Sequence, residues 1–72
     1  VKIIIKNALE KLASSIILVH NHPSGNPYPG DNDKNQTKLL KDAAAFFDIS
    51  LLDHLIIAGD SYYSFADEGL MG

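Results

Sequence analysis

The sequence has no cysteine and no arginine, and it has no apolar run long enough to cross a bilayer. The lack of cysteine excludes disulfides and thiolate metal sites, and it is typical of a reducing compartment. The lack of arginine, together with a net charge of −3 from six basic and nine acidic residues, argues against direct nucleic-acid binding. No signal-peptide pattern is visible, so we expect a cytoplasmic protein without membrane contact.

The short length limits what the chain can build. Its 72 residues make at most one domain, and a domain of this size buries only about 60% of the surface that its unfolded chain exposes. Small domains without disulfides often depend on a metal, a partner or a longer parent chain. Because the sequence begins with Val1 rather than methionine, we expect residues 1–72 to be a single fragment of a longer protein.

The hydrophobic pattern predicts an α/β fold. The strand–helix–strand passage favours a right-handed crossover with parallel neighbours, and "GDS" is typical of a hairpin turn. We therefore expect a small mixed β-sheet flanked by helices, in the order α-β-α-β-β. The predicted elements are a helix over 1–13, a strand over 16–20, a loop over 21–32, a helix over 33–47, and strands over 49–59 and 62–65.

The expected core is carried by the first strand and the second helix. The run "IILVH" is typical of a buried strand. The tail over 66–72 is expected to form a short helical turn or to fray. The apolar stripe predicted for the second helix consists of Leu39, Leu40, Ala43, Phe46 and Phe47.

The stretch "VHNHPSG", residues 19–25, places two histidines at the end of the first predicted strand. Residues two apart in a strand point to the same side, so His20 and His22 can face one point. Zinc takes imidazole nitrogens and carboxylate oxygens. Asp33, at the start of the second helix, is the best third ligand, and Asp31 is the reserve. The pattern alone leaves open a polar strand end with Asp33 as a simple N-cap, a role for which Asp31 and Asn32 are also suited.

The segments "LVHNHPSG" and "LLDHLIIAGDSYYSF", with Pro27, Pro29 and Asp33 between them, resemble the JAB-like domain of the bacterial RadC family. Members of that family are commonly labelled DNA repair proteins, and the domain belongs to the wider JAMM (MPN+) metalloprotease superfamily. The resemblance covers essentially the whole chain but only the C-terminal part of the family's domain. It implies a JAB/MPN-like, cytidine deaminase-like fold.

The resemblance also implies a site. In it His20, His22 and Asp33 bind zinc, a glutamate on an upstream strand acts as general acid/base, and a serine three residues before the aspartate stabilises the oxyanion. Gly30 occupies that serine position here, and the loss of such a donor can cost orders of magnitude in rate. Ser24, Thr37 or a main-chain donor could replace the serine, and the sequence does not decide among them.

Two glutamates of this chain are poorly placed to serve as the general base. Glu10 is expected near the end of the first helix, and the strand over 15–20 separates it from the histidines by about 17 Å, at roughly 3.3 Å per residue. Glu68 follows the hairpin. We expect both to be surface residues, and we expect the catalytic glutamate upstream of this chain.

His54 and Asp53 lie together in "LLDH". His54 is expected to be a structural histidine, held by Asp53 or by main chain, rather than a fourth ligand. Asp53 recurs in the family's segment, as the resemblance implies, and its expected role is either to support the site or to cap a turn.

Other residue groups are expected to be structural. Three lysines on the second helix are typical of a solvated face rather than a phosphate site. The aromatic residues around the last strand are better explained by core contacts than by stacking on bases. Tyr28 in the loop is the aromatic residue that we expect to contact a substrate. The structural residues in question are Lys34, Lys38, Lys41, Tyr62, Tyr63 and Phe65.

These observations favour two classes of function. The first is a zinc-dependent JAMM-type hydrolase domain in a DNA repair-associated protein, cutting a peptide or isopeptide bond in a peptide or protein substrate. The second is a non-catalytic metal-binding or protein-interaction module that acts in DNA-associated processes. A direct role in DNA repair would require a DNA-binding domain elsewhere in the parent protein. The substrate, the metal and the oligomeric state are not specified by the sequence.

Overall fold

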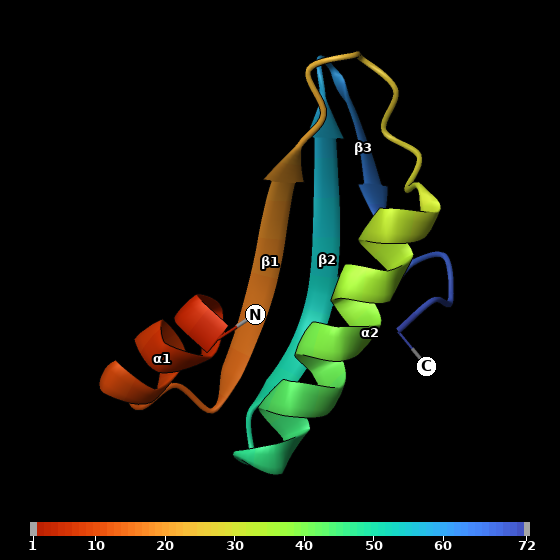
Figure 1. The fold of residues 1–72 in the computed structure, drawn as a ribbon. Coiled ribbons are helices and arrows are strands. Elements are labelled where there is room, and N and C mark those ends of the chain that lie inside the picture. The colour runs from red at the N-terminus through yellow and green to blue at the C-terminus, as the bar shows by residue number, and fades with distance from the viewer. Residues whose placement is uncertain (1, 72) are drawn as a thin grey trace.

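The computed structural model describes residues 2–71 and has the predicted α/β order, with a three-stranded mixed sheet and two helices. The sheet order is β1-β2-β3, with β1 parallel to β2 and β2 antiparallel to β3. The predicted parallel neighbours and the predicted hairpin are therefore confirmed. The elements are α1 (Lys2–Glu10), β1 (Ser15–Asn21), α2 (Asp31–Phe46), β2 (Ser50–Ala58) and β3 (Ser61–Ser64) (Figure 1).

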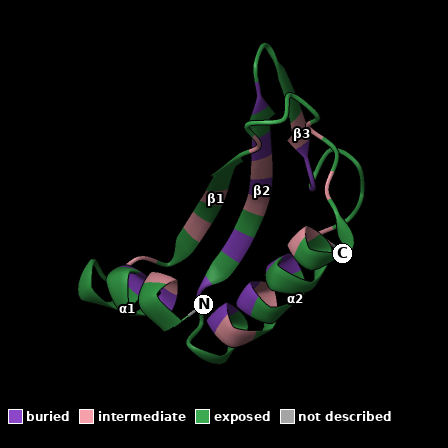
Figure 2. Cartoon of the chain, turned by 45° about the horizontal axis from the view of Figure 1, so that its top comes forward, coloured by how far each residue is buried: buried purple, intermediate pink, exposed green. Residues whose placement is uncertain are grey.

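The core lies between the helices and one face of the sheet. Helix α2 runs along β2 in the opposite direction, and α1 lies beside the lower part of β1 (Figure 1). Buried residues follow the inner side of α2 and the length of β2 (Figure 2). Within residues 2–71, neither helix is long and apolar enough to span a membrane. The largest buried cluster is Ile5, Ala8, Leu40, Ala44, Ile49 and Leu51.

Helix α1 ends three residues before the predicted boundary. Leu12 adopts a φ of 53°, and the amides of Leu12 and Ala13 donate to the carbonyls of Leu9 and Ala8. This pair of bonds is the Schellman arrangement, which satisfies the last carbonyls of a helix and reverses the chain. The helix therefore stops before Ser14, and β1 can begin at Ser15.

The stripe predicted for α2 is wrong in three of its five members. Leu40 is 1% exposed and faces the core, but Leu39 is 57% exposed, and Phe46 and Phe47 are exposed as well. The buried side of α2 is centred on a line that includes the polar residue Thr37. A prediction from hydropathy leaves Thr37 out and therefore shifts the buried stripe around the helix. The buried residues of α2 are Thr37, Leu40 and Ala44.

The first strand is less buried than predicted. Its pattern alternates, with Ile16 and Leu18 half-buried and Ile17 and Val19 exposed. Strand β1 lies at the edge of the sheet, and the helices contact only one of the two faces among the described residues. Residues 16–20 therefore have the apolar composition of a strand buried on both faces, but in the structure only one face of β1 is covered.

The β2–β3 hairpin is secured at both ends. A two-residue turn begins at Gly59, whose φ of 58° suits the first position of such a turn. At the other end, the Asp53 carboxylate accepts hydrogen bonds from Ser64 Oγ (2.6 Å), Ala66 N (2.9 Å) and His54 N (2.7 Å). Burial works to raise the pKa of Asp53, but these bonds outweigh it and lower the pKa. Of its two expected roles, Asp53 has the capping one.

The two leucines at 39 and 40 give a direct test of the core. We predict that Leu40→Ala lowers the free energy of unfolding by about 2–5 kcal/mol, because it leaves a cavity beside the sheet. Leu39→Ala, its matched control, should change that free energy by no more than about 0.5 kcal/mol. Urea unfolding followed by circular dichroism measures both. Equal effects would contradict the assignment of the buried face.

Candidate metal centre

His20 and His22 share one face of the sheet. His20 is in β1, and the amide of His22 donates to the carbonyl of Ile57 at 2.9 Å, which continues the parallel pairing one residue past the strand. Because side chains alternate along an extended chain, the two imidazoles project to the same side. In register, His20 lies opposite Ile56, which is fully buried. Both histidines therefore point toward the side that α2 covers.

Asp33 lies in the first turn of α2 and is held there by its own carboxylate. The helix begins at Asp31, and its N-cap is Gly30 rather than one of residues 31–33 as predicted. The Gly30 amide donates to Asp33 Oδ2 at 2.9 Å. A backward bond of this kind satisfies a free amide at the helix start and fixes the carboxylate. Asp31, the reserve ligand, is exposed and is not part of the cluster described below.

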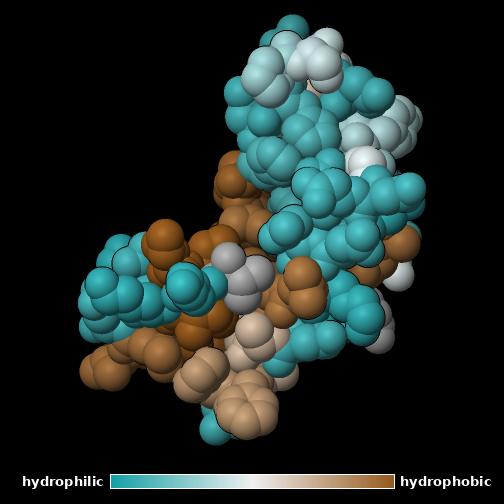
Figure 3. Space-filling model, in the orientation of Figure 1, coloured by the Kyte–Doolittle hydropathy of each residue, from teal (hydrophilic) through white to brown (hydrophobic). Residues whose placement is uncertain are grey.

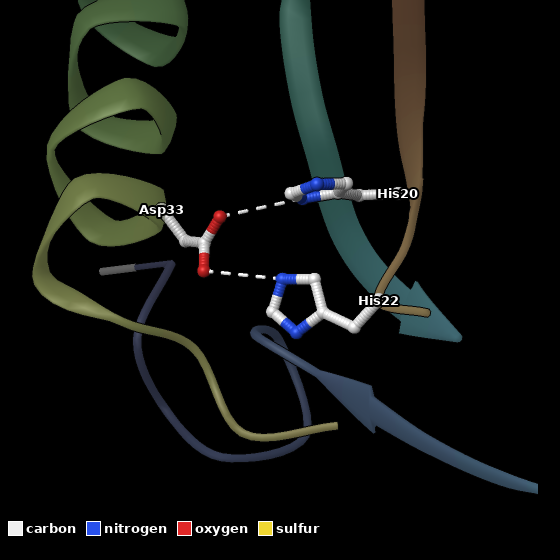
Figure 4. Close-up of side chains that lie close together, drawn as sticks. All are labelled: His20, His22 and Asp33. Atoms are coloured by element: carbon white, nitrogen blue, oxygen red, sulfur yellow. Dashed lines mark ion pairs between the residues drawn. The ribbon is translucent and has the colours of Figure 1, made fainter. Parts of the chain in front are cut away.

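The three predicted ligands converge. Figure 4 shows the two imidazoles pointing toward the carboxylate. His20 Nδ1 lies 3.3 Å from Asp33 Oδ1, and His22 Nε2 lies 3.3 Å from Asp33 Oδ2. One potential ligand atom from each residue lies within 4.8 Å of the others. Two imidazole nitrogens and one carboxylate oxygen are a donor set that suits zinc and leaves a coordination position open.

The hydrogen bonding of His22 fits a metal ligand. Its Nδ1 lies 3.0 Å from the carbonyl oxygen of Asn26, and a carbonyl can only accept, so Nδ1 carries the proton. In the neutral ring, Nε2 then presents a lone pair to a carboxylate oxygen. A proton or a metal cation between these two acceptors would relieve their repulsion. Metal-binding histidines are commonly held in this way, with the second ring N–H given to a carbonyl or carboxylate.

The Asp33 carboxylate is ionised near neutral pH. Burial works to raise its pKa, but the Gly30 hydrogen bond and the nearby His22 and His20 outweigh this and lower the pKa. The carboxylate is only 14% exposed, whereas the side chain of His20 is 43% exposed. The cluster is thus anchored on its helix side and accessible on its His20 side.

His54 lies behind the cluster and is 2% exposed. Its ring is nearly parallel to those of Phe65 (centroids 4.6 Å apart, 11°) and His20 (5.8 Å, 19°). Its Nδ1 lies 2.5 Å from Thr37 Oγ1, while Asp53 bonds only to its backbone amide. His54 is thus a buried histidine whose backbone amide is held by Asp53, as expected, but whose ring bonds Thr37, which the sequence did not indicate. Burial lowers the pKa of His54, and the neighbouring His20 adds to this, so the ring is neutral.

The remaining candidate residues lie outside the cluster of His20, His22 and Asp33. Glu10 forms an ion pair with Lys6 (3.7 Å) on α1, and Glu68 is an exposed residue of the C-terminal turn, as expected. Tyr28 is exposed and packs edge-on against Tyr63, with ring centroids 5.9 Å apart; its contact with a substrate stays a prediction. Among the predicted core aromatics, Phe65 is buried and Tyr63 half-buried. The expectation is wrong for Tyr62, which is exposed.

The lysines behave largely as the solvated face that the sequence predicts. Lys34 and Lys38 are exposed, and Lys38 pairs with Asp42 at 3.3 Å. Lys41 is half-buried, and its Nζ donates to the carbonyl of Met71. These three lysines border a hollow that Phe65 and Met71 also line, so they lie on the side of α2 that faces the C-terminal segment.

With this geometry established, comparison with known proteins identifies the family. Residues 1–70 match the model of the protein family described as "RadC-like JAB domain". The chain belongs to this family. The RadC-like JAB domain is 49% identical over 70 residues to a UPF0758 protein of Flavobacterium johnsoniae, covering 97% of the chain and 31% of the relative. It is 48% identical over 66 residues to one of Herminiimonas arsenicoxydans, covering 92% and 30%. It is also 49% identical over 65 residues to a UPF0758 protein of Streptococcus gordonii, covering 90% of the chain and 29% of the relative. The chain thus spans about 31% of the first relative's length.

The expected serine position of this RadC-like JAB domain is open but unfilled. A Cβ added at Gly30 would lie 3.7 Å from Asp33 Oδ2, an ordinary contact, and the backbone φ of −84° suits any residue. The Gly30 amide is engaged by Asp33. The Thr37 hydroxyl donates to the carbonyl of Asp33 at 2.7 Å, and Ser24 Oγ accepts from the Asn26 amide at 3.4 Å. Of the expected substitutes, neither the Gly30 amide nor the Thr37 hydroxyl is a free donor.

Two supports of the site were not predicted from the sequence. Asn26 orients His22 through a main-chain carbonyl, which leaves no signal in residue type. The Thr37–His54 contact joins residues 17 positions apart, and no local pattern indicates it. The sequence does suggest the other bond of Thr37, because a hydroxyl four residues after Asp33 can bond back to the Asp33 carbonyl along a helix.

Proposed function

We propose that this chain carries the metal-binding part of a zinc-dependent hydrolase of the JAMM type, which acts on a peptide or isopeptide bond. The observation that carries the proposal is the convergence of His20, His22 and Asp33 from β1 and α2, with ligand atoms within 4.8 Å. Membership of the RadC-like JAB domain family supports it.

Each ligand residue contributes a separate property. His22 is oriented by its bond to the Asn26 carbonyl. Asp33 supplies the negative charge and is fixed by the Gly30 amide. His20 borders the exposed side, where a substrate could approach. Zinc held by these residues would supply Lewis acidity, which polarises a carbonyl and makes water a better nucleophile at neutral pH.

The rest of the machinery lies elsewhere. No glutamate belongs to the cluster found among residues 2–71. We therefore assign the general acid/base to another part of the full-length protein, in keeping with relatives about three times as long as this chain. The chain carries a net charge of −3, so any association with DNA would be made by another part of that protein.

A second candidate function is a non-catalytic metal-binding or protein-interaction module in DNA-associated processes. The observation that favours it is Gly30. This residue offers no hydroxyl, its amide is engaged by Asp33, and the nearby Thr37 hydroxyl is also engaged. Such a module would bind zinc tightly without turning over a substrate, or would bind no zinc.

We predict that the protein binds about one zinc ion per chain and that Asp33→Asn weakens this binding strongly. Zinc at 100 times its dissociation constant should raise the free energy of unfolding by about 2.7 kcal/mol. Isothermal titration calorimetry and thermal unfolding, each with and without a chelator, measure the two effects. Asp31→Asn is the matched control and should bind zinc normally. A wild type without zinc binding, or equal losses in both variants, would contradict the site.

We predict that Gly30→Ser raises zinc-dependent hydrolysis in the full-length protein about tenfold or more, since removing one oxyanion donor typically costs about 100- to 1,000-fold in kcat. Fluorogenic peptide and isopeptide substrates measure the rate. Gly30→Ala adds the Cβ without the hydroxyl and should leave the rate unchanged. Failure of the wild type and of both variants to turn over any substrate, with zinc fully bound, would favour the non-catalytic module.

A further inference from the structure

We propose that Thr37 and His54 form a positioning pair that holds His20 and Asp33 in place and thereby sets the metal affinity of the site. This inference rests on the proposed metal-binding function. Neither residue is one of the three cluster members. Both are buried, with Thr37 3% exposed and His54 2% exposed, so they act from behind the cluster.

The hydrogen positions follow from the chemistry of the partners. Thr37 lies one turn after Asp33, and its hydroxyl donates to the Asp33 carbonyl at 2.7 Å. A hydroxyl has one proton, so the 2.5 Å contact with His54 must be a bond that Thr37 accepts. His54 is therefore protonated on Nδ1. The two bonds connect the backbone of Asp33 to a side chain of β2.

The same imidazole also backs His20. The His54 ring lies between Phe65 on one face and His20 on the other, with interplanar angles of 11° and 19°. His22 meets the His20 ring edge-on at 4.7 Å. The His20 side chain is 43% exposed, and these two contacts restrict the orientations from which its Nδ1 can face Asp33. His54 thus touches one ligand residue directly and reaches a second through Thr37.

An unpaired atom argues that His54 is more than a core filler. With the proton on Nδ1, Nε2 is a buried acceptor, and it has no hydrogen-bond partner among the described residues. Leaving a buried polar atom unpaired destabilises a protein, and an apolar side chain of similar shape would avoid that cost. The bond from Nδ1 to Thr37 therefore explains why an imidazole, rather than an apolar side chain, occupies this position.

The test compares Thr37→Val, which removes the hydroxyl at nearly constant shape, with Thr37→Ser, which keeps it. Zinc affinity is measured in the purified protein by competition with a chromophoric chelator, at a temperature where each metal-free variant is folded. We expect Thr37→Val to weaken zinc binding about 10- to 100-fold, the usual effect of removing a group that orients a metal ligand. Thr37→Ser should restore it to within about threefold of wild type, by the same reasoning.

Two further measurements separate positioning from packing. His54→Phe keeps an aromatic ring between Phe65 and His20 but cannot bond Thr37, so it should weaken zinc binding while the metal-free melting temperature stays the same or rises. In Thr37→Val the visible absorption bands of bound Co²⁺, which report ligand geometry, should shift. Leu40→Val, a core change in the same helix, should leave affinity and spectrum unaltered.

Wild-type zinc affinity in both Thr37→Val and His54→Phe would overturn the positioning pair and leave the metal site intact. A lower melting temperature of metal-free Thr37→Val with unchanged zinc affinity would also overturn it, because that is the result of a purely structural role. A wild-type protein that binds no zinc would overturn this inference together with the proposed function.

Discussion

The carboxylate of Asp33 is the group on which the rest of the site depends, because it serves the helix and the cluster at once. One of its oxygens accepts the Gly30 amide where α2 begins, and the same oxygen faces His22. Its other oxygen faces His20. A single anion therefore satisfies a helix start, where negative charge is favourable, and joins α2 to the end of β1. The loop between them can lack regular structure because both of its ends are fixed by this group.

The fold separates the residues that stabilise it from those that form the site. On the face shown in Figure 3, hydrophobic side chains gather between α1 and the lower end of the sheet, whereas hydrophilic residues cover the upper end, toward which β1 and its loop run. The apolar cluster contributed by α1, α2 and β2 supplies burial. Among residues 2–71, the buried polar residues are His54, Thr37 and Ser64, and they lie between that cluster and the upper end. The apolar cluster and the candidate site thus lie toward opposite ends of the sheet, and Ile56 and Phe65 add further apolar burial beside the site.

The sequence predicted the fold class, the strand pairing and the three converging residues. These features follow from local rules: alternation along a strand places His20 and His22 on one side, and a helix that returns along a parallel partner brings Asp33 back to the strand end. What escaped prediction depends on contacts between elements. Thr37 can be buried on α2 because its hydroxyl bonds the His54 ring on β2. A hydropathy pattern cannot predict a pair of polar residues that are buried together. Capping was one of the two roles expected for Asp53, and the choice between them depends on the position of Ser64 at the end of β3.

The most direct test of the metal centre is anomalous diffraction at the zinc absorption edge from crystals of the zinc-loaded protein. We predict one strong peak, at about 2.0–2.2 Å from a nitrogen of His20, from Nε2 of His22 and from a carboxylate oxygen of Asp33. The same crystals should show His22 Nδ1 still bonded to the Asn26 carbonyl. A peak at another position, or none in crystals with zinc in large excess, would contradict the assignment of these three residues as a metal centre.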